Sequence, residues 1–232
     1  MKVALLGDIH GNLPALRAVL DEAREEGIER LLVTGDIVGY YFWPRACLEA
    51  LSAWQAEIVR GNHEDMLREA QADPRRADAI REKFGSGIDI ALHELDEDQL
   101  RLIDAWPRTL PARVAGRSLL VCHGSPEDTN EYVYPDASPD QLARMVVPGA
   151  TVVAFGHTHH PMVRELEGCT LANPGSVGQP RNRQSGACWA TYDGSTDSID
   201  LRVTNYDALS VAEEARRRHP ELPHLSRVLL AS

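Results

Sequence analysis

Side chains that can bind metal ions recur along the chain, each directly after an apolar run. Asp8 and His10 follow the first run, at residues 3–6. This run is continuous rather than alternating, so we expect a short buried strand. Residues two apart on an extended chain project to the same side, so the carboxylate and the imidazole would leave the same face. A metal site is one interpretation, and a turn whose aspartate caps the next helix is the other.

Later apolar runs end in the same way. Their motifs are Gly35-Asp36, Gly61-Asn62-His63-Glu64, His123-Gly124 and Gly156-His157-Thr158-His159. A single histidine at a strand end is more often a buried structural residue than a ligand. Together with the motif of Asp8 and His10, these motifs contain five of the nine histidines, all of them near a glycine. The needs of folding alone do not explain that pattern.

Strands and helices alternate in the first part of the chain, which favours a largely parallel sheet with a site at the strand ends. Residues 65–106 show no strand pattern and predict a helical insertion of two or three helices, broken near residues 85–87, that covers one edge of the site. The other expected helices are at 13–26, 44–54 and 207–218. The expected strands are at 3–6, 31–34, 57–60, 110–114, 118–122, 151–155, 163–166, 170–171, 187–192 and 198–203.

The composition limits the class of protein. A chain of 232 residues, 43% of them hydrophobic and without repeats or linkers, predicts one α/β domain spanning residues 1–232. The net charge of −11 argues against extended nucleic acid or a membrane as partner. The four cysteines lack CxxC spacing, which fits a reducing compartment. Since no signal peptide or long apolar run is present, we expect a cytoplasmic protein.

In their order, the five motifs resemble those of the calcineurin-like metallophosphoesterase superfamily. The resemblance runs from residue 3 to about residue 180, and residues 173–178 look like the small bacterial and archaeal phosphoesterases. It implies a four-layer α-β-β-α sandwich of two mixed β-sheets flanked by helices. It also implies two divalent transition-metal ions at the strand ends. Manganese is the metal we expect, and iron, zinc, cobalt or nickel would also suit the mixed nitrogen and oxygen ligands.

The resemblance also assigns roles to individual residues. The ligands of one metal would be Asp8, His10 and His159, those of the other Asn62, His123 and His157, and Asp36 would bridge both. His63 would not be a ligand but would face the substrate and help protonate the leaving oxygen. Two metals can hold the oxygens of a phosphate ester and generate a hydroxide near neutral pH.

The residues after Asp36 depart from part of the superfamily. The protein Ser/Thr phosphatases and the symmetrical dinucleoside tetraphosphatases carry Gly-Asp-x-Val-Asp-Arg-Gly, whereas this chain has Gly39 and Tyr40 in place of the second aspartate and the arginine. Both activities are therefore disfavoured. The aromatic run 40–43 is either a stacking wall for a base, with Phe42 and Trp43 as substrate contacts, or a packing or dimer contact. Arg181 is a further candidate for binding the substrate phosphate.

These patterns predict a two-metal hydrolase of phosphate esters. The expected activity is that of a phosphodiesterase or nucleotide phosphoesterase acting on a small phosphorylated substrate with a metal-bound hydroxide. A phosphomonoesterase or an unsymmetrical dinucleoside polyphosphate hydrolase is the alternative. A non-catalytic binding scaffold fits less well, because every expected ligand and His63 are present. A homodimer is expected only if the aromatic run is a contact between two copies.

Overall fold

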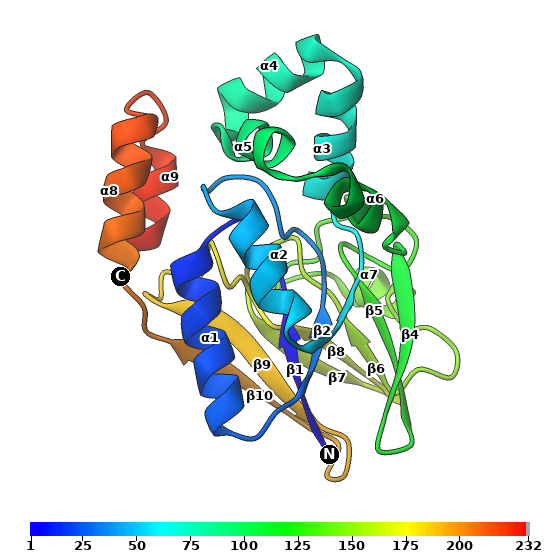
Figure 1. Cartoon of the computed structure of the whole chain (residues 1–232). Coiled ribbons are helices and arrows are strands. Elements are labelled where there is room, and N and C mark those ends of the chain that lie inside the picture. Colours follow the sequence, from blue (N-terminus) through cyan, green and yellow to red (C-terminus); the bar gives the residue numbers. More distant parts are fainter. Residues whose placement is uncertain (231–232) are drawn as a thin grey trace.

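Two five-stranded β-sheets pack face to face, and helices lie on their outer sides (Figure 1). The computed structural model describes residues 1–230. The first sheet contains, in spatial order, β10 (Ser198–Thr204), β9 (Ala187–Asp193), β1 (Lys2–Leu6), β2 (Arg30–Val33) and β3 (Gln55–Ile58). The second contains β4 (Thr109–Val114), β5 (Arg117–Cys122), β6 (Val152–Ala154), β8 (Cys169–Asn173) and β7 (Met162–Leu166). Both sheets are mixed, so the predicted four-layer sandwich is confirmed.

The first strand shows why its sequence is apolar without alternation. Ala4 and Leu6 pack toward α1 (Leu13–Glu25) and α2 (Pro44–Ser52), whereas Val3 and Leu5 pack toward the second sheet. A strand buried on both faces needs no polar positions. Strands β1, β2 and β3 are parallel, so their carboxyl ends meet at one edge of the sheet.

The second sheet brings its own motifs to the same region. Strands β5, β6 and β8 are parallel, and the motifs at 123–124 and 156–159 follow β5 and β6. A short helix, α7 (Pro139–Arg144), covers the outer face, where Leu142 packs in one cluster with Val153 and Leu171. The two sheets therefore present their motif-bearing ends to one common site.

The helical insertion has four helices, so the prediction of two or three was wrong. They are α3 (Asn62–Ala72), α4 (Pro74–Phe84), α5 (Gly87–Glu94) and α6 (Glu97–Ala105), which form a cap at one end of the sandwich (Figure 1). Asp73 ends α3 and caps α4 by accepting from the Arg75 backbone N–H, and Pro74 begins α4. Aspartate followed by proline is a helix start signal inside this polar stretch. Asp96 caps the last of these helices by accepting from the Gln99 backbone N–H at 2.9 Å.

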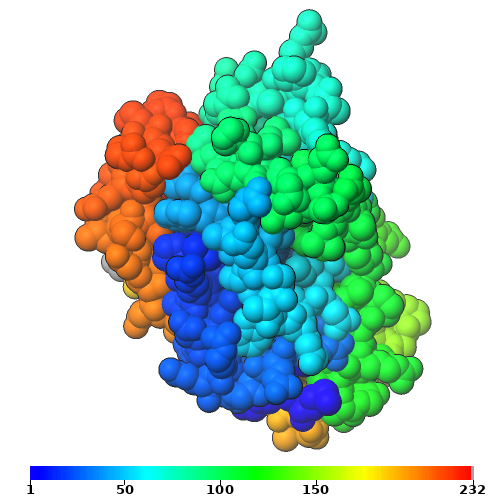
Figure 2. Space-filling model, viewed as in Figure 1, coloured from blue at the N-terminus to red at the C-terminus, as the bar shows by residue number. Residues whose placement is uncertain are grey.

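The C-terminal segment adds α8 (Ala208–Arg218), which was predicted, and α9 (His224–Arg227) with a 3₁₀ turn (Val228–Leu230), which were not. Four residues are too few for a periodic signal. This segment lies against the helical insertion (Figure 2), and Val211 and Leu225 pack against the aromatic run. None of the helices in the described part of the chain is long and apolar enough to cross a membrane.

Candidate metal centre

The chain turns sharply where each motif leaves its strand. Five motif residues have left-handed backbone conformations, with φ between 52° and 67°: Asp8, His10, Asp36, His157 and His159. The prediction that an extended chain aligns the first two side chains was therefore wrong, and left-handed turns direct them instead. Such a conformation costs a residue other than glycine about 1–2 kcal/mol. Backbone hydrogen bonds between the loops hold it, for example from the Asp8 N–H to the Gly35 carbonyl at 3.0 Å.

One group of converging donors comprises Asp8, His10 and His159, all buried. The Nε2 atoms of the two histidines are 3.0 Å apart, and His159 Nε2 lies 3.4 Å from Asp8 Oδ1. These residues follow β1 and β6, so the group joins the two sheets.

A second group comprises Asp36, His123 and His157. His123 Nε2 lies 3.3 Å from Asp36 Oδ2, 2.9 Å from Asn62 Oδ1 and 3.2 Å from His157 Nδ1. Asp36 Oδ2 is also 3.7 Å from His10 Nε2 in the first group. The two groups therefore adjoin at Asp36, and the structure brings together all seven residues that the sequence suggested as ligands.

The far nitrogens of the histidines show that these groups suit a cation. Nδ1 of His10 faces the Val38 carbonyl at 3.1 Å, and Nδ1 of His159 faces the Gln179 carbonyl at 2.7 Å. A carbonyl only accepts, so each Nδ1 donates and each Nε2 keeps its lone pair. Burial lowers the pKa of both imidazoles well below the ordinary value, which keeps them neutral. Two lone pairs that face each other at 3.0 Å fit a metal ion bound between them.

Asp8 and His123 hold protons at neutral pH in this arrangement. Burial is the main reason that the pKa of Asp8 is raised from 3.8 to about 8; His123 opposes the rise and Asp36 adds to it. Burial lowers the pKa of His123, but Asp36 and Asp8 outweigh it and raise the value to about 9. A divalent cation would displace both protons on binding, because metal ligands must be deprotonated.

Glu64 holds the loop that carries Asp36, a role that the sequence analysis did not assign. Its buried carboxylate accepts from the backbone N–H groups of Asp36 at 2.9 Å, Ile37 at 2.7 Å and Gly61 at 2.8 Å. The bond to Gly61 lies at the start of α3, where the glutamate side chain reaches back to the backbone N–H of the N-cap residue. The spacing of an N-cap residue and a glutamate three residues later was the available signal.

His63 lies beside both donor groups. Its backbone N–H donates to Asp36 Oδ1 at 2.8 Å, while its buried Nδ1 has no hydrogen-bond partner within residues 1–230. Burial is the main cause that lowers its pKa from 6.5 to about 4. A Cβ atom added at Gly39, where φ is +92°, would overlap Nδ1 and lie 3.0 Å from Cε1. The glycine thus leaves the space that the imidazole occupies.

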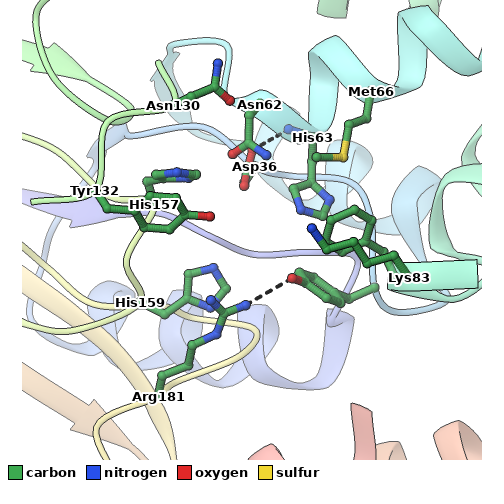
Figure 3. Close-up of a pocket in the computed structure, with 12 residues that line it drawn as sticks. Asp36, Asn62, His63, Met66, Lys83, Asn130, Tyr132, His157, His159 and Arg181 are labelled. Atoms are coloured by element: carbon green, nitrogen blue, oxygen red, sulfur yellow. Dashed lines mark hydrogen bonds between the residues drawn. The ribbon is translucent and has the colours of Figure 1, made fainter. Parts of the chain in front are cut away.

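A cavity of about 370 Å³ opens over these residues (Figure 3). Apart from the donor groups and His63, its lining is Tyr40, Met66, Lys83, Phe84, Asn130, Tyr132 and Arg181. Of the substrate contacts suggested by the sequence, Arg181 lines the cavity and Phe42 and Trp43 do not. Phe42 is 3% exposed and packs under Arg218, whose guanidinium carbon is 4.7 Å from the ring centroid. Its surroundings correspond to the packing interpretation of the aromatic run.

Comparison with known proteins agrees with this architecture. Residues 1–197 match the family model described as the calcineurin-like phosphoesterase superfamily domain. An uncharacterized protein of Methanocaldococcus jannaschii is 29% identical over 239 residues, which cover 94% of each chain. A hypothetical protein of Pyrococcus horikoshii has a similar crystal structure, with a TM-score of 0.83 and 22% identity over 98% of this chain and 97% of that one. The crystal structure of a metallophosphoesterase from Sphaerobacter thermophilus is also similar, with a TM-score of 0.79. Its sequence identity is 24%, and the match covers 100% of this chain and 99% of that one.

Proposed function

The chain belongs to the calcineurin-like phosphoesterase superfamily and is a metal-dependent phosphoester hydrolase, and we propose that it acts on a phosphodiester or a nucleotide phosphoester. The observation that carries this proposal is the meeting of two donor groups at Asp36 on the floor of a small cavity. A phosphomonoesterase or an unsymmetrical dinucleoside polyphosphate hydrolase remains the alternative, since both reactions need the same centre.

We infer that the two donor groups bind one divalent ion each and share Asp36. The proposed ligands are Asp8, His10 and His159 for one ion and Asn62, His123 and His157 for the other. Bound together, the two ions would supply Lewis acidity and a nucleophile near neutral pH. The protein would contribute imidazole ligands of fixed orientation. In His10, His123 and His159, Nδ1 faces a backbone carbonyl, which leaves Nε2 for the metal. We propose manganese as the metal.

His63 is proposed to give a proton to the leaving oxygen. Its ring lines the cavity while its backbone N–H is bonded to Asp36, so its position is tied to the metal centre. An imidazole with a pKa near 4 is neutral at pH 7, but a bound phosphate anion favours its protonated form. Its Nδ1 atom has no hydrogen-bond partner within residues 1–230.

The cavity supports a small substrate. Tyr132 and Phe84 form part of its walls, and about 370 Å³ is at the small end for ligand pockets, which run from roughly 300 to 1,000 Å³. Tyr40 occupies the sequence position at which the protein Ser/Thr phosphatases have an arginine. Its hydroxyl accepts a hydrogen bond from Arg181 at 3.0 Å. A small molecule suits these walls better than a folded phosphoprotein does.

The test is turnover by protein of measured metal content. The protein is stripped with a chelator, reloaded separately with manganese, iron, zinc, cobalt or nickel, and assayed with bis(p-nitrophenyl) phosphate, p-nitrophenyl phosphate and an unsymmetrically cleaved dinucleotide. We expect the diester to give a higher kcat/KM than the monoester. Preference for the monoester or the dinucleotide would favour the alternative. No turnover of any substrate at two bound metals per chain would refute the proposed function.

A further inference from the structure

Two cations of the cavity wall, Lys83 and Arg181, have no acidic partner among the residues that the structure describes. They lie on α4 and in the loop between β8 and β9, and both extend toward the cavity (Figure 3). Among residues 1–230, no aspartate or glutamate forms an ion pair with either of them, although Arg81 on the same helix as Lys83 pairs with Asp78 and Asp89. The chain has a net charge of −11, so acidic partners are plentiful. Two cationic side chains without such a partner at one cavity therefore indicate a site for an anionic ligand.

Neutral groups hold Arg181 in place without cancelling its charge. Its Nη2 donates to the Tyr40 hydroxyl at 3.0 Å and to Gln179 Oε1 at 2.7 Å. The Tyr40 ring in turn packs against His10 and His63, with centroids 4.6 Å and 4.9 Å apart. The guanidinium is therefore fixed relative to the metal centre. Within the described part of the chain its other N–H groups make no hydrogen bond, so they can bind a ligand.

Lys83 stands out in a chain that otherwise uses arginine. Of the 24 lysines and arginines, only Lys2 and Lys83 are lysine. Its Nζ lies 4.8 Å from the Phe84 ring centroid. Just beyond it, the backbone N–H and the hydroxyl of Ser86 lie 3.0 Å and 2.8 Å from His219 Nε2, so α8 fixes the end of the helix that carries Lys83. A flexible ammonium on a fixed backbone suits an anion whose position varies.

We propose that Lys83 and Arg181 form a subsite for a second anionic group of the substrate. This rests on the proposed function, because the metal centre would bind the phosphate that is cleaved. Two divalent ions with two carboxylates leave a charge of about +2, more than a singly charged diester neutralises. The two side chains add two further positive charges. The substrate class is then a phosphoester that carries another phosphate or a carboxylate near the cleaved bond, and Lys83 distinguishes it from a simple diester.

Three phosphonates that differ only in their second group test the subsite. Methylphosphonate has none, phosphonoacetate has a carboxylate, and methylenediphosphonate has a second phosphonate. Each inhibits turnover of bis(p-nitrophenyl) phosphate by the metal-loaded protein at fixed free metal. We expect the doubly functional inhibitors to bind more tightly, and Lys83→Ala to reduce their advantage over methylphosphonate by about 5- to 10-fold, the size of a partly exposed charged hydrogen bond.

The readout is the ratio of inhibition constants within each variant, so a general effect of a substitution on turnover cancels. Lys83→Arg should keep most of the ratio. Lys2→Ala, which removes the same charge at the start of β1, should keep all of it. A ratio that does not change in Lys83→Ala would overturn the subsite. If Lys83→Ala lowers the ratio for methylenediphosphonate alone, the natural second group is a phosphate. If it lowers the ratio for phosphonoacetate alone, that group is a carboxylate.

A second readout needs no turnover. The metal-loaded protein is treated with an acylating reagent, and modification of its two lysines is measured by peptide mass spectrometry. Methylenediphosphonate should protect Lys83 and leave Lys2 unprotected, whereas methylphosphonate should protect neither. Equal modification of Lys83 with and without methylenediphosphonate would refute the proposal. A protein that protected Lys83 but cleaved no phosphoester would instead refute the proposed function.

Discussion

Replacing Gly39 with alanine should disable His63 without removing metal. The added Cβ would overlap His63 Nδ1 and lie 3.0 Å from Cε1 and 3.1 Å from Cγ, inside ordinary contact distance. Relief requires the ring to move by roughly 1 Å, a displacement that can cost about 10²-fold in rate when it misplaces a reacting group. Loss of a general acid outright costs roughly 10²–10⁴-fold, which is what we expect of His63→Ala. The Gly39→Ala, His63→Ala double variant should be no slower than His63→Ala alone, because both substitutions remove one function.

A matched control separates this effect from backbone strain. Gly116, between β4 and β5, has a φ of +85°, close to the +92° of Gly39, and an added Cβ there meets nothing within 4 Å. Gly116→Ala should therefore lose a similar amount of stability, about 1–2 kcal/mol, and keep its activity. The assays are metal content, melting temperature and kcat/KM with leaving groups of different pKa. The defect of Gly39→Ala should shrink as the leaving group improves. Near-normal turnover of a substrate with a poor leaving group, or loss of a metal ion, would refute the role given to His63.

Three further predictions concern the metal centre and the aromatic run. Asp36→Asn should lower the occupancy of both metals and reduce turnover by several orders of magnitude; two retained metals with a near-normal rate would exclude a bridging role. Phe42→Ala should destabilise the fold by about 3–5 kcal/mol, as truncation of a buried aromatic does, and affect all substrates alike; a selective rise in KM for nucleotides at unchanged melting temperature would contradict its packing role. Metal-stripped protein should become less stable as pH rises from about 6.5 to 8, because folded Asp8, with its pKa of about 8, and His123, with its pKa of about 9, keep protons that the unfolded chain has lost. Chemical denaturation at several pH values measures the free energy of unfolding, which should not fall in this way for the metal-loaded protein. If it falls equally with and without metal, the assignment of Asp8 and His123 as metal ligands is refuted.

The sequence by itself indicated which donor side chains meet at the centre and which elements carry them. Apolar runs that end in glycine and a polar side chain are local patterns, and parallel strands bring their ends to one edge whatever the details of packing. Asp8 and His157 are 149 residues apart, yet the Asp8 carboxylate accepts from the His157 backbone N–H at 3.1 Å. The helix caps at Asn12 and Asp96 likewise depend on local sequence, because an N-cap side chain bonds within the first turn of its own helix.

Only the tertiary structure decided which side chains form the wall of the cavity. Phe42 and Tyr40 belong to the same aromatic run, but packing against α8 buries Phe42 in the core, while Tyr40 lines the cavity. Lys83 and Tyr132 come from segments without any motif, and the fold of the helical insertion and of the loop before α7 brings them to the site. Such placement depends on contacts between distant parts of the chain, for which no spacing in the sequence is a guide. The proposed metal ligands could be foreseen because each follows a strand. The other side chains that line the cavity could not, because several separate segments together define the space that they enclose.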